Sequence, residues 1–175
     1  MQEDNKSRAT IFIFSALAFV VLYALDRLSK TMAVAKLKDS VPVKFFNDNF
    51  ELSYLENQGA AWGILSGKIW LLVIFTAIVL CLLLFFYFRI PNDKHFMMLR
   101  IAMLLIISGA LGNIIDRIRF RYVIDFLYFK AIDFPVFNVA DCYVTIGTFM
   151  LVIGLLFVYK DSELGFWFLD SKSEE

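Results

Sequence analysis

The chain has 175 residues, of which 60% are hydrophobic and 19% are charged, and its mean hydropathy is +0.70. Soluble domains contain about 45–50% apolar residues, so this composition excludes an ordinary soluble domain. Seventeen basic residues balance seventeen acidic ones, and a neutral balance predicts no nucleic-acid partner. At this length we expect a single membrane domain that covers residues 1–175.

Four stretches are apolar enough to be membrane-spanning helices. The predicted spans are residues 11–32, 69–88, 96–117 and 139–159. A span needs about 20 apolar residues, and the second and fourth come close to that without interruption. The third requires Arg100 to extend its charged end to the membrane surface. The first requires Asp26 and Lys30 to be accommodated, and because they are four positions apart they can pair on a helix.

The first span has an alternative interpretation as a cleavable signal peptide. Lys6 and Arg8 precede its apolar stretch, and small residues at positions 33–35 resemble a cleavage site. The charges of Asp26 and Lys30 lie just before that site, where a signal peptide is normally uncharged. We therefore interpret the stretch as a membrane helix.

The two longer connectors, residues 37–66 and 118–137, contain segments that resemble β-strands. Alternating or β-branched patterns of this kind are typical of short strands. The strand-like segments are residues 41–43, 50–54 and 122–129. With four spans both connectors lie on one side of the membrane, where we expect a small β-rich platform. Basic residues divide too evenly for the positive-inside rule to assign that side.

Cysteine and histidine offer little catalytic or metal-binding chemistry. Cys81 lies inside an apolar run, so we expect both it and Cys142 to be free thiols. His95 is the single histidine, and one His with two Cys is too few ligands for a His/Cys zinc site. Cys142 has no histidine to activate it, and no Gly-x-Ser-x-Gly motif is present. We expect no metal and no organic cofactor.

Polar residues gather at the platform end of the spans. An ionisable group at the edge of a span costs free energy, so such a group is by default a candidate functional residue. The gathered residues are Asp26, Lys30, Asn57, Asn113, Asp116, Arg117, Asp125, Asn138 and Asp141. Several also have a structural explanation: Asp26 with Lys30, and Asp116 with Arg117, as ion pairs at helix ends, and Asn138 as an N-cap.

Two acids are the candidates for catalysis. Asp125 lies in an apolar strand-like segment without a basic neighbour on its own face, which predicts a raised pKa. Asp141 lies in the first turn of the fourth span, where the helix dipole favours negative charge. Across the turn that contains Pro135 the two carboxylates can face each other and share a proton, as acid and base for peptide hydrolysis require. We expect Asp141 to hold the charge and Asp125 the proton.

Five short stretches, in matching order and spacing over residues 26–147, resemble the motifs of one family. They are Asp26-Arg-Leu-Ser-Lys30, Asn57-Gln-Gly-Ala-Ala61, Gly109-Ala-Leu-Gly-Asn-Ile-Ile-Asp-Arg117, Val123-Ile-Asp-Phe126 and Phe137-Asn-Val-Ala-Asp141. The chain thereby resembles the bacterial lipoprotein signal peptidases, or signal peptidase II. Two departures are Ser108, where Gly or Ala is common, and residues 161–175, which carry no family motif.

The resemblance implies an intramembrane aspartic endopeptidase of the bacterial cytoplasmic (inner) membrane, with both termini cytoplasmic and the platform and active site at the outer face. The implied substrate is a prolipoprotein with diacylglyceryl on a cysteine, cut just before that cysteine. The implied catalytic dyad is Asp125 and Asp141. Implied supporting residues are Asn57, Gly59, Asn113, Arg117 and Asn138, and implied structural residues are Asp26, Lys30 and Asp116. We expect membrane lipids as further partners and a monomer.

Two alternatives of other classes remain at this point. Intramembrane acids also serve proton- or cation-coupled transporters, but here they lie at one edge, and the middles of the spans lack polar groups. The chain can also be a non-enzymatic subunit whose polar edge binds a partner. Residues 166–169 form an aromatic cluster suited to the membrane interface, to which we assign no role.

Overall fold

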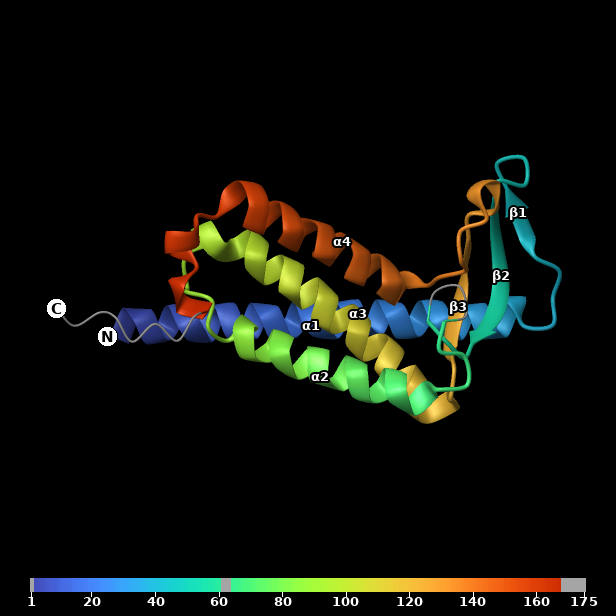
Figure 1. Ribbon diagram of the computed structural model, residues 1–175, viewed down its shortest axis with the longest axis horizontal. Coiled ribbons are helices and arrows are strands. Elements are labelled where there is room, and N and C mark those ends of the chain that lie inside the picture. The colour runs from blue at the N-terminus through green and yellow to red at the C-terminus, as the bar shows by residue number, and fades with distance from the viewer. Residues whose placement is uncertain (1, 61–63, 168–175) are drawn as a thin grey trace.

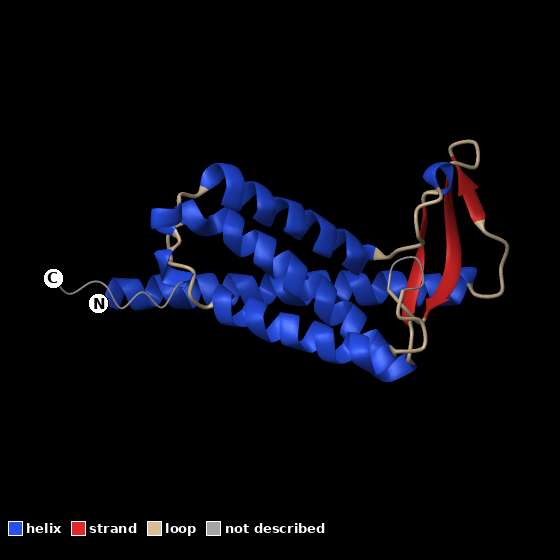
Figure 2. Cartoon of the chain, in the orientation of Figure 1, coloured by secondary structure: helices blue, strands red, loops and turns tan. Residues whose placement is uncertain are grey.

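The structure, a computed structural model, describes residues 2–60 and 64–167, with side chains from residue 9 onward in those ranges. Four helices run side by side, and a small sheet lies at one end of them, whereas the first residues of α1 and the last described residues lie at the other end (Figures 1 and 2). The helices are α1 (Gln2–Leu37), α2 (Ile69–Tyr87), α3 (Met97–Phe120) and α4 (Val139–Ile153). The predicted fold class, four apolar helices with a small β-rich platform, is confirmed.

Each helix belongs to a segment long and apolar enough to cross a membrane. Within the described residues these segments are Ala9–Leu37, Ile69–Tyr87, Lys94–Phe120 and Val139–Val158. The third and fourth segments are longer than the helices α3 and α4 themselves. A 3₁₀ turn precedes α3, and a π-helical turn, Gly154–Val158, follows α4. The third segment is by far the most buried of the four, so α3 is the central helix of the bundle.

The platform is an antiparallel sheet of three strands in the order β1-β2-β3. The strands are β1 (Val43–Phe45), β2 (Phe50–Asn57) and β3 (Val123–Tyr128). The predicted strands at 50–54 and 122–129 are confirmed, but the one at 41–43 is wrong because β1 begins only at Val43, which pairs with Leu52. Pro42 has no N–H to donate to a sheet, so pairing starts after it.

The last turns of α1 belong to the platform as well as to the membrane bundle. The helix continues five residues beyond the predicted span 11–32 and ends beside the sheet (Figure 1). There the buried Ala33 and Leu37 pack against Ile124 and Phe126 of β3. This apolar contact holds the sheet on the helix that carries Asp26 and Lys30.

Close contact between α3 and α4 depends on glycine. A Cβ on Gly109 would collide with the carbonyl oxygen of Ala140, and one on Gly147 would lie 2.6 Å from that of Ala102. A Cβ on Gly112 would lie 2.6 Å from Asp26 Oδ2. Small residues let membrane helices approach this closely, and here the approach brings the start of α4 against the polar end of α3.

The opposite end of the bundle corrects one prediction. Arg100 was expected to keep its charged end in water, but it is only 8% exposed and donates to the carbonyl oxygens of Ile90 (2.7 Å) and Pro91 (3.1 Å). The carbonyls after a helix C-terminus lack partners within the helix, which explains the attraction. Phe166 and Trp167 pack on the bundle, whereas residues 168 and 169 lie outside the described residues. Both predicted free thiols are confirmed.

Candidate active site

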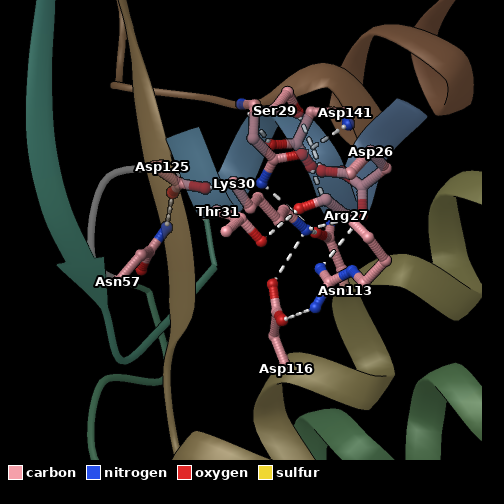
Figure 3. Close-up of polar contacts among 11 residues, drawn as sticks. Asp26, Arg27, Ser29, Lys30, Thr31, Asn57, Asn113, Asp116, Asp125 and Asp141 are labelled. Carbon is pink, nitrogen blue, oxygen red and sulfur yellow. Dashed lines mark hydrogen bonds and ion pairs between the residues drawn. The ribbon is translucent and has the colours of Figure 1, made fainter. Parts of the chain in front are cut away.

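Polar side chains from α1, α3, α4 and the sheet converge at one junction (Figure 3). The junction holds the residues predicted from the sequence, and it divides into a cluster of four charges and a pair of acids with their amide partners. The charge cluster consists of Asp26, Arg27, Lys30 and Asp116. The acid pair, Asp125 and Asp141, is surrounded by Asn57, Asn113 and Asn138.

The charge cluster joins α1 to α3. Lys30 Nζ lies 3.2 Å from Asp26 Oδ2 and 2.8 Å from Asp116 Oδ2, and these three side chains are at most 1% exposed. Arg27 Nη1 donates to Asp116 Oδ1 over 2.6 Å, and its Nη2 donates to Asp26 Oδ2 over 3.0 Å. Two cations thus neutralise two buried carboxylates, which would otherwise cost several kcal/mol each.

This cluster confirms one predicted ion pair and overturns another. Asp26 pairs with Lys30 as predicted. Asp116 does not pair with Arg117, because consecutive helix side chains point about 100° apart, and it pairs instead with Lys30 and with Arg27, 89 residues earlier. Arg27 was not among the predicted site residues, since only the packing of α1 on α3 gives it this partner.

Asp125 projects from the middle of β3 and is 2% exposed. Its Oδ2 accepts a hydrogen bond from Asn57 Nδ2 over 2.8 Å, and its Oδ1 accepts one from Asn138 Nδ2 over 2.6 Å. Burial, and after it the charge of Asp141, raise the pKa of Asp125 to about 7. The raised pKa agrees with the expectation from its apolar strand.

Asp141 is positioned by the start of α4. Asn138 is the N-cap, as predicted: its Oδ1 accepts from the backbone N–H of Asp141 (3.1 Å), and its own backbone N–H donates to Asp141 Oδ2 (3.0 Å). A two-way bridge between Phe137 and Leu127 holds the residue before this cap beside β3. Asn138 can therefore contact both acids at once.

Asn113 connects the acids to the charge cluster. Its Nδ2 donates to Asp141 Oδ1 over 2.7 Å, while its Oδ1 accepts from Lys30 Nζ (2.9 Å) and from Asn138 Nδ2 (3.2 Å). Because an ammonium can only donate, Lys30 requires the amide oxygen of Asn113 on its side. That requirement turns the amide N–H₂ toward Asp141.

Arg117 holds the loop that follows β2. Its Nη2 donates to the carbonyl oxygen of Gly59 over 3.3 Å, and the N–H of Gly59 donates to Asn57 Oδ1 over 2.9 Å. The second bond leaves Asn57 Nδ2 free to donate to Asp125. The predicted supporting residues are therefore all linked to the two acids.

A cavity of about 600 Å³ lies against the acid pair. One part of its wall is polar, with both acids, Asn57, Asn113 and Arg117. The rest is largely apolar and comes from the segment between β3 and α4 and from α4 itself. These apolar residues include Phe129, Ile132, Phe134, Phe137 and Ile146. The cavity thus combines a polar wall that carries both acids with an apolar surface suited to hydrocarbon.

Paired carboxylates beside a cavity, in a bundle of membrane-spanning helices, define the class of membrane-embedded aspartic hydrolases. Known proteins identify the branch of that class. The family model described as "Signal peptidase (SPase) II" matches residues 18–157. The lipoprotein signal peptidase of Clostridium tetani is 42% identical over 135 residues, which are 75% of this chain and 85% of the relative. That of Halothermothrix orenii is 38% identical over 146 residues, 83% and 95% of the two chains.

Solved structures agree with the sequence relatives. Two structures described as bacterial membrane enzymes superpose with TM-scores of 0.69 and 0.70, at 34% and 33% identity. The first comparison covers 82% of this chain and 87% of the other, and the second covers 83% and 94%. The chain belongs to the signal peptidase II family and is a multi-pass membrane enzyme, an aspartic peptidase. The resemblance inferred from the five motifs is confirmed, and neither the transporter nor the non-enzymatic subunit is supported.

Proposed function

We propose that this enzyme removes signal peptides from diacylglyceryl-modified prolipoproteins by cutting before the lipidated cysteine, with Asp125 and Asp141 as its catalytic dyad. The observation that carries the proposal is the bridge made by Asn138, which binds both acids beside a cavity with apolar walls. The names of the relatives, which are lipoprotein signal peptidases, supply the class of substrate.

The mechanism divides acid and base between the two carboxylates. Asp141, in the first turn of α4, carries the charge, because the helix dipole and two N–H donors favour it there. Asp125 carries the proton. A water between them gives a proton to Asp141 as its oxygen attacks the scissile carbonyl carbon, and Asp125 protonates the carbonyl oxygen.

Collapse of the tetrahedral intermediate completes the reaction. The carbon–nitrogen bond breaks as Asp141 gives its proton to the leaving amine, and the new hydroxyl returns a proton to Asp125. Both acids end in their starting states, so the net reaction consumes one water. Asn57, Asn113 and Asn138 hold the carboxylates by neutral amide donors, which orient them without exchanging protons.

The remaining wall residues bind the substrate. Arg117, anchored on Gly59, holds the peptide backbone, and the diacylglyceryl chains lie on the apolar wall that includes Phe129 and Ile146. A lipid that stays partly in the bilayer during cleavage requires a site at the membrane edge. We place both termini in the cytoplasm, the sheet at the outer face of the bacterial inner membrane, and the working enzyme as a monomer.

The purified full-length chain should cut a diacylglyceryl-modified precursor without any other protein. Mass spectrometry should find the lipidated cysteine at the new N-terminus. The same precursor without lipid is the matched control, and its kcat/KM should be lower by at least about 100-fold, because the acyl chains lose their burial on the apolar wall. Equal cleavage of both precursors, or a cut at another bond, would refute the proposed specificity.

Activity should fall as the pH rises through about 7. The reaction needs the protonated form of Asp125, and its pKa, raised to about 7 by burial and by Asp141, means that this form dominates only below that pH. Lys30 on α1 opposes the shift, and Arg117 on α3 also faces the dyad. Well above the pKa, kcat should drop about tenfold for each pH unit. A kcat that stays constant between pH 6 and 9, with the fold intact by thermal unfolding, would contradict this assignment.

A further inference from the structure

Two adjoining cavities lie at the end of the bundle away from the sheet. The larger, of about 560 Å³, is formed by the start of α1 and the α2–α3 connection. The smaller, of about 230 Å³, runs between α1, α2 and α3. Ile11, Tyr87 and Arg100 line both. The proposed peptidase mechanism uses neither cavity.

Arg100 lies at their junction, where among the described side chains its guanidinium faces carbonyl oxygens and the ring of Tyr87, 5.6 Å from the ring centroid, and no carboxylate. It forms no ion pair with any carboxylate whose side chain the structure describes. Its Nη2 donates all of its hydrogen bonds, which go to Ile90 O, Pro91 O and Asn92 Oδ1. Its buried Nε has no hydrogen-bond partner. Carbonyl dipoles attract a cation but do not neutralise it, and a buried unpaired charge within a span costs free energy.

The two cavities differ in the polarity of their walls, and together they suit a molecule with a charged head and an apolar chain. The larger cavity holds a second cation, Arg89, and the amide of Asn92. The smaller one is almost wholly apolar, with Phe14 and Ala18 of α1 facing Ile101 and Leu104 of α3. Its α1 wall, residues 11–18, extends about 10 Å along the helix. Phe14 is 67% exposed and Ile101 43% exposed, so this groove opens toward the bilayer.

We propose that these cavities bind one anionic phospholipid from the membrane leaflet at the end of the bundle away from the sheet. Its phosphate pairs with the guanidinium of Arg100, which lines both cavities, and is further attracted by Arg89. One acyl chain lies in the apolar groove between α1 and α3. The negative charge neutralises the buried guanidinium, and the acyl chain covers apolar side chains that already face lipid. The proposal is independent of the peptidase function.

Native mass spectrometry of the full-length chain can test this site. The protein is released from nanodiscs that contain phosphatidylglycerol and phosphatidylcholine with identical acyl chains. Wild type should retain one phosphatidylglycerol in preference to phosphatidylcholine. Arg100→Gln should reduce that retention about tenfold, because a charge-assisted bond to phosphate is lost. Lys94→Gln is the matched control, since it removes the same charge from an exposed position at the same end.

A second pair of variants tests the acyl groove without changing charge. Ala18→Trp fills the groove and should also reduce retention about tenfold, whereas Ala16→Trp, at an exposed position of the same helix that does not line it, should not. If Arg100→Gln does not fold, Ala18→Trp decides. Retention unchanged in Ala18→Trp would overturn the proposal, as would equal losses in Lys94→Gln and Arg100→Gln. Displacement of the lipid by inorganic phosphate at equal concentration would identify a free-anion site instead and overturn it too.

Discussion

Asp125→Asn and Asp141→Asn are each expected to lower kcat on a lipidated precursor by at least about 10³-fold. An amide of the same shape can neither take a proton from water nor give one to the carbonyl oxygen. Because the two acids act together on one water, their substitutions should not be additive. The double variant should be at most a few-fold slower than the slower of the two single variants. Single-turnover assays with mass spectrometry of the product measure these rates.

Asp39→Asn is the matched control for the dyad. Asp39 is exposed, follows α1 at the same end of the molecule, and has a positive φ of 62°, which Asn tolerates well. This variant should keep wild-type kcat. Thermal unfolding should show that both dyad variants remain folded, because each substitution keeps the side-chain volume and adds no buried charge. A dyad variant that is folded and keeps more than about a tenth of wild-type kcat would exclude that acid from general acid–base chemistry.

Lys30→Met is expected to lower the free energy of unfolding by about 3–5 kcal/mol. Of the four charged groups in the cluster, the variant keeps two buried carboxylates, Asp26 and Asp116, but only one cation, Arg27. It also removes the donor that orients Asn113, so the residual folded enzyme should be slow. The midpoint of thermal unfolding in detergent measures the loss of stability, and kcat of the folded fraction measures the loss of orientation.

Two further variants separate charge balance from packing. Lys38→Met makes the same substitution at an exposed lysine, 3.1 Å from Glu56 Oε1, and should lower the free energy of unfolding far less than Lys30→Met does, because solvent screens an exposed ion pair. In the double variant Lys30→Met with Asp26→Asn, one acid again faces one base, and part of the lost stability should return. If Lys30→Met were no more harmful than Lys38→Met, the buried cluster would not hold α1 on α3.

How far the sequence predicted the site depends on whether a contact is local. Asn138 was correctly identified as a cap, because its partner Asp141 lies three residues away and the geometry follows from helix termini alone. The pair of Asp26 and Lys30 was correct for the same reason. The pairing of Asp116 with Arg117 was wrong, because adjacency in sequence is not adjacency on a helix surface.

Arg100 illustrates the same limit at the other end of the bundle. Its position near the start of a span suggested that it reaches the membrane surface, since long basic side chains often do so. In the structure the carbonyls after α2 lie within its reach instead. Whether the guanidinium reaches water or these carbonyls depends on how the α2–α3 connection folds back on the helices. Hydropathy carries no information about that path.

The sequence by itself determined the four apolar helices, two of the three strands, the polar edge and the family. The length of an apolar run determines whether a segment can span a bilayer. The family was recognised from the order and spacing of its motifs, which are read directly from the sequence. Only the tertiary structure decided that Arg27 completes the charge cluster, that Asn138 binds both Asp125 and Asp141, and that Lys30 orients Asn113. Those contacts join segments 13 to 89 residues apart. The packing of α1 on α3 creates the contacts of Arg27 and Lys30, and the bridge from β3 to the start of α4 brings Asn138 to Asp125.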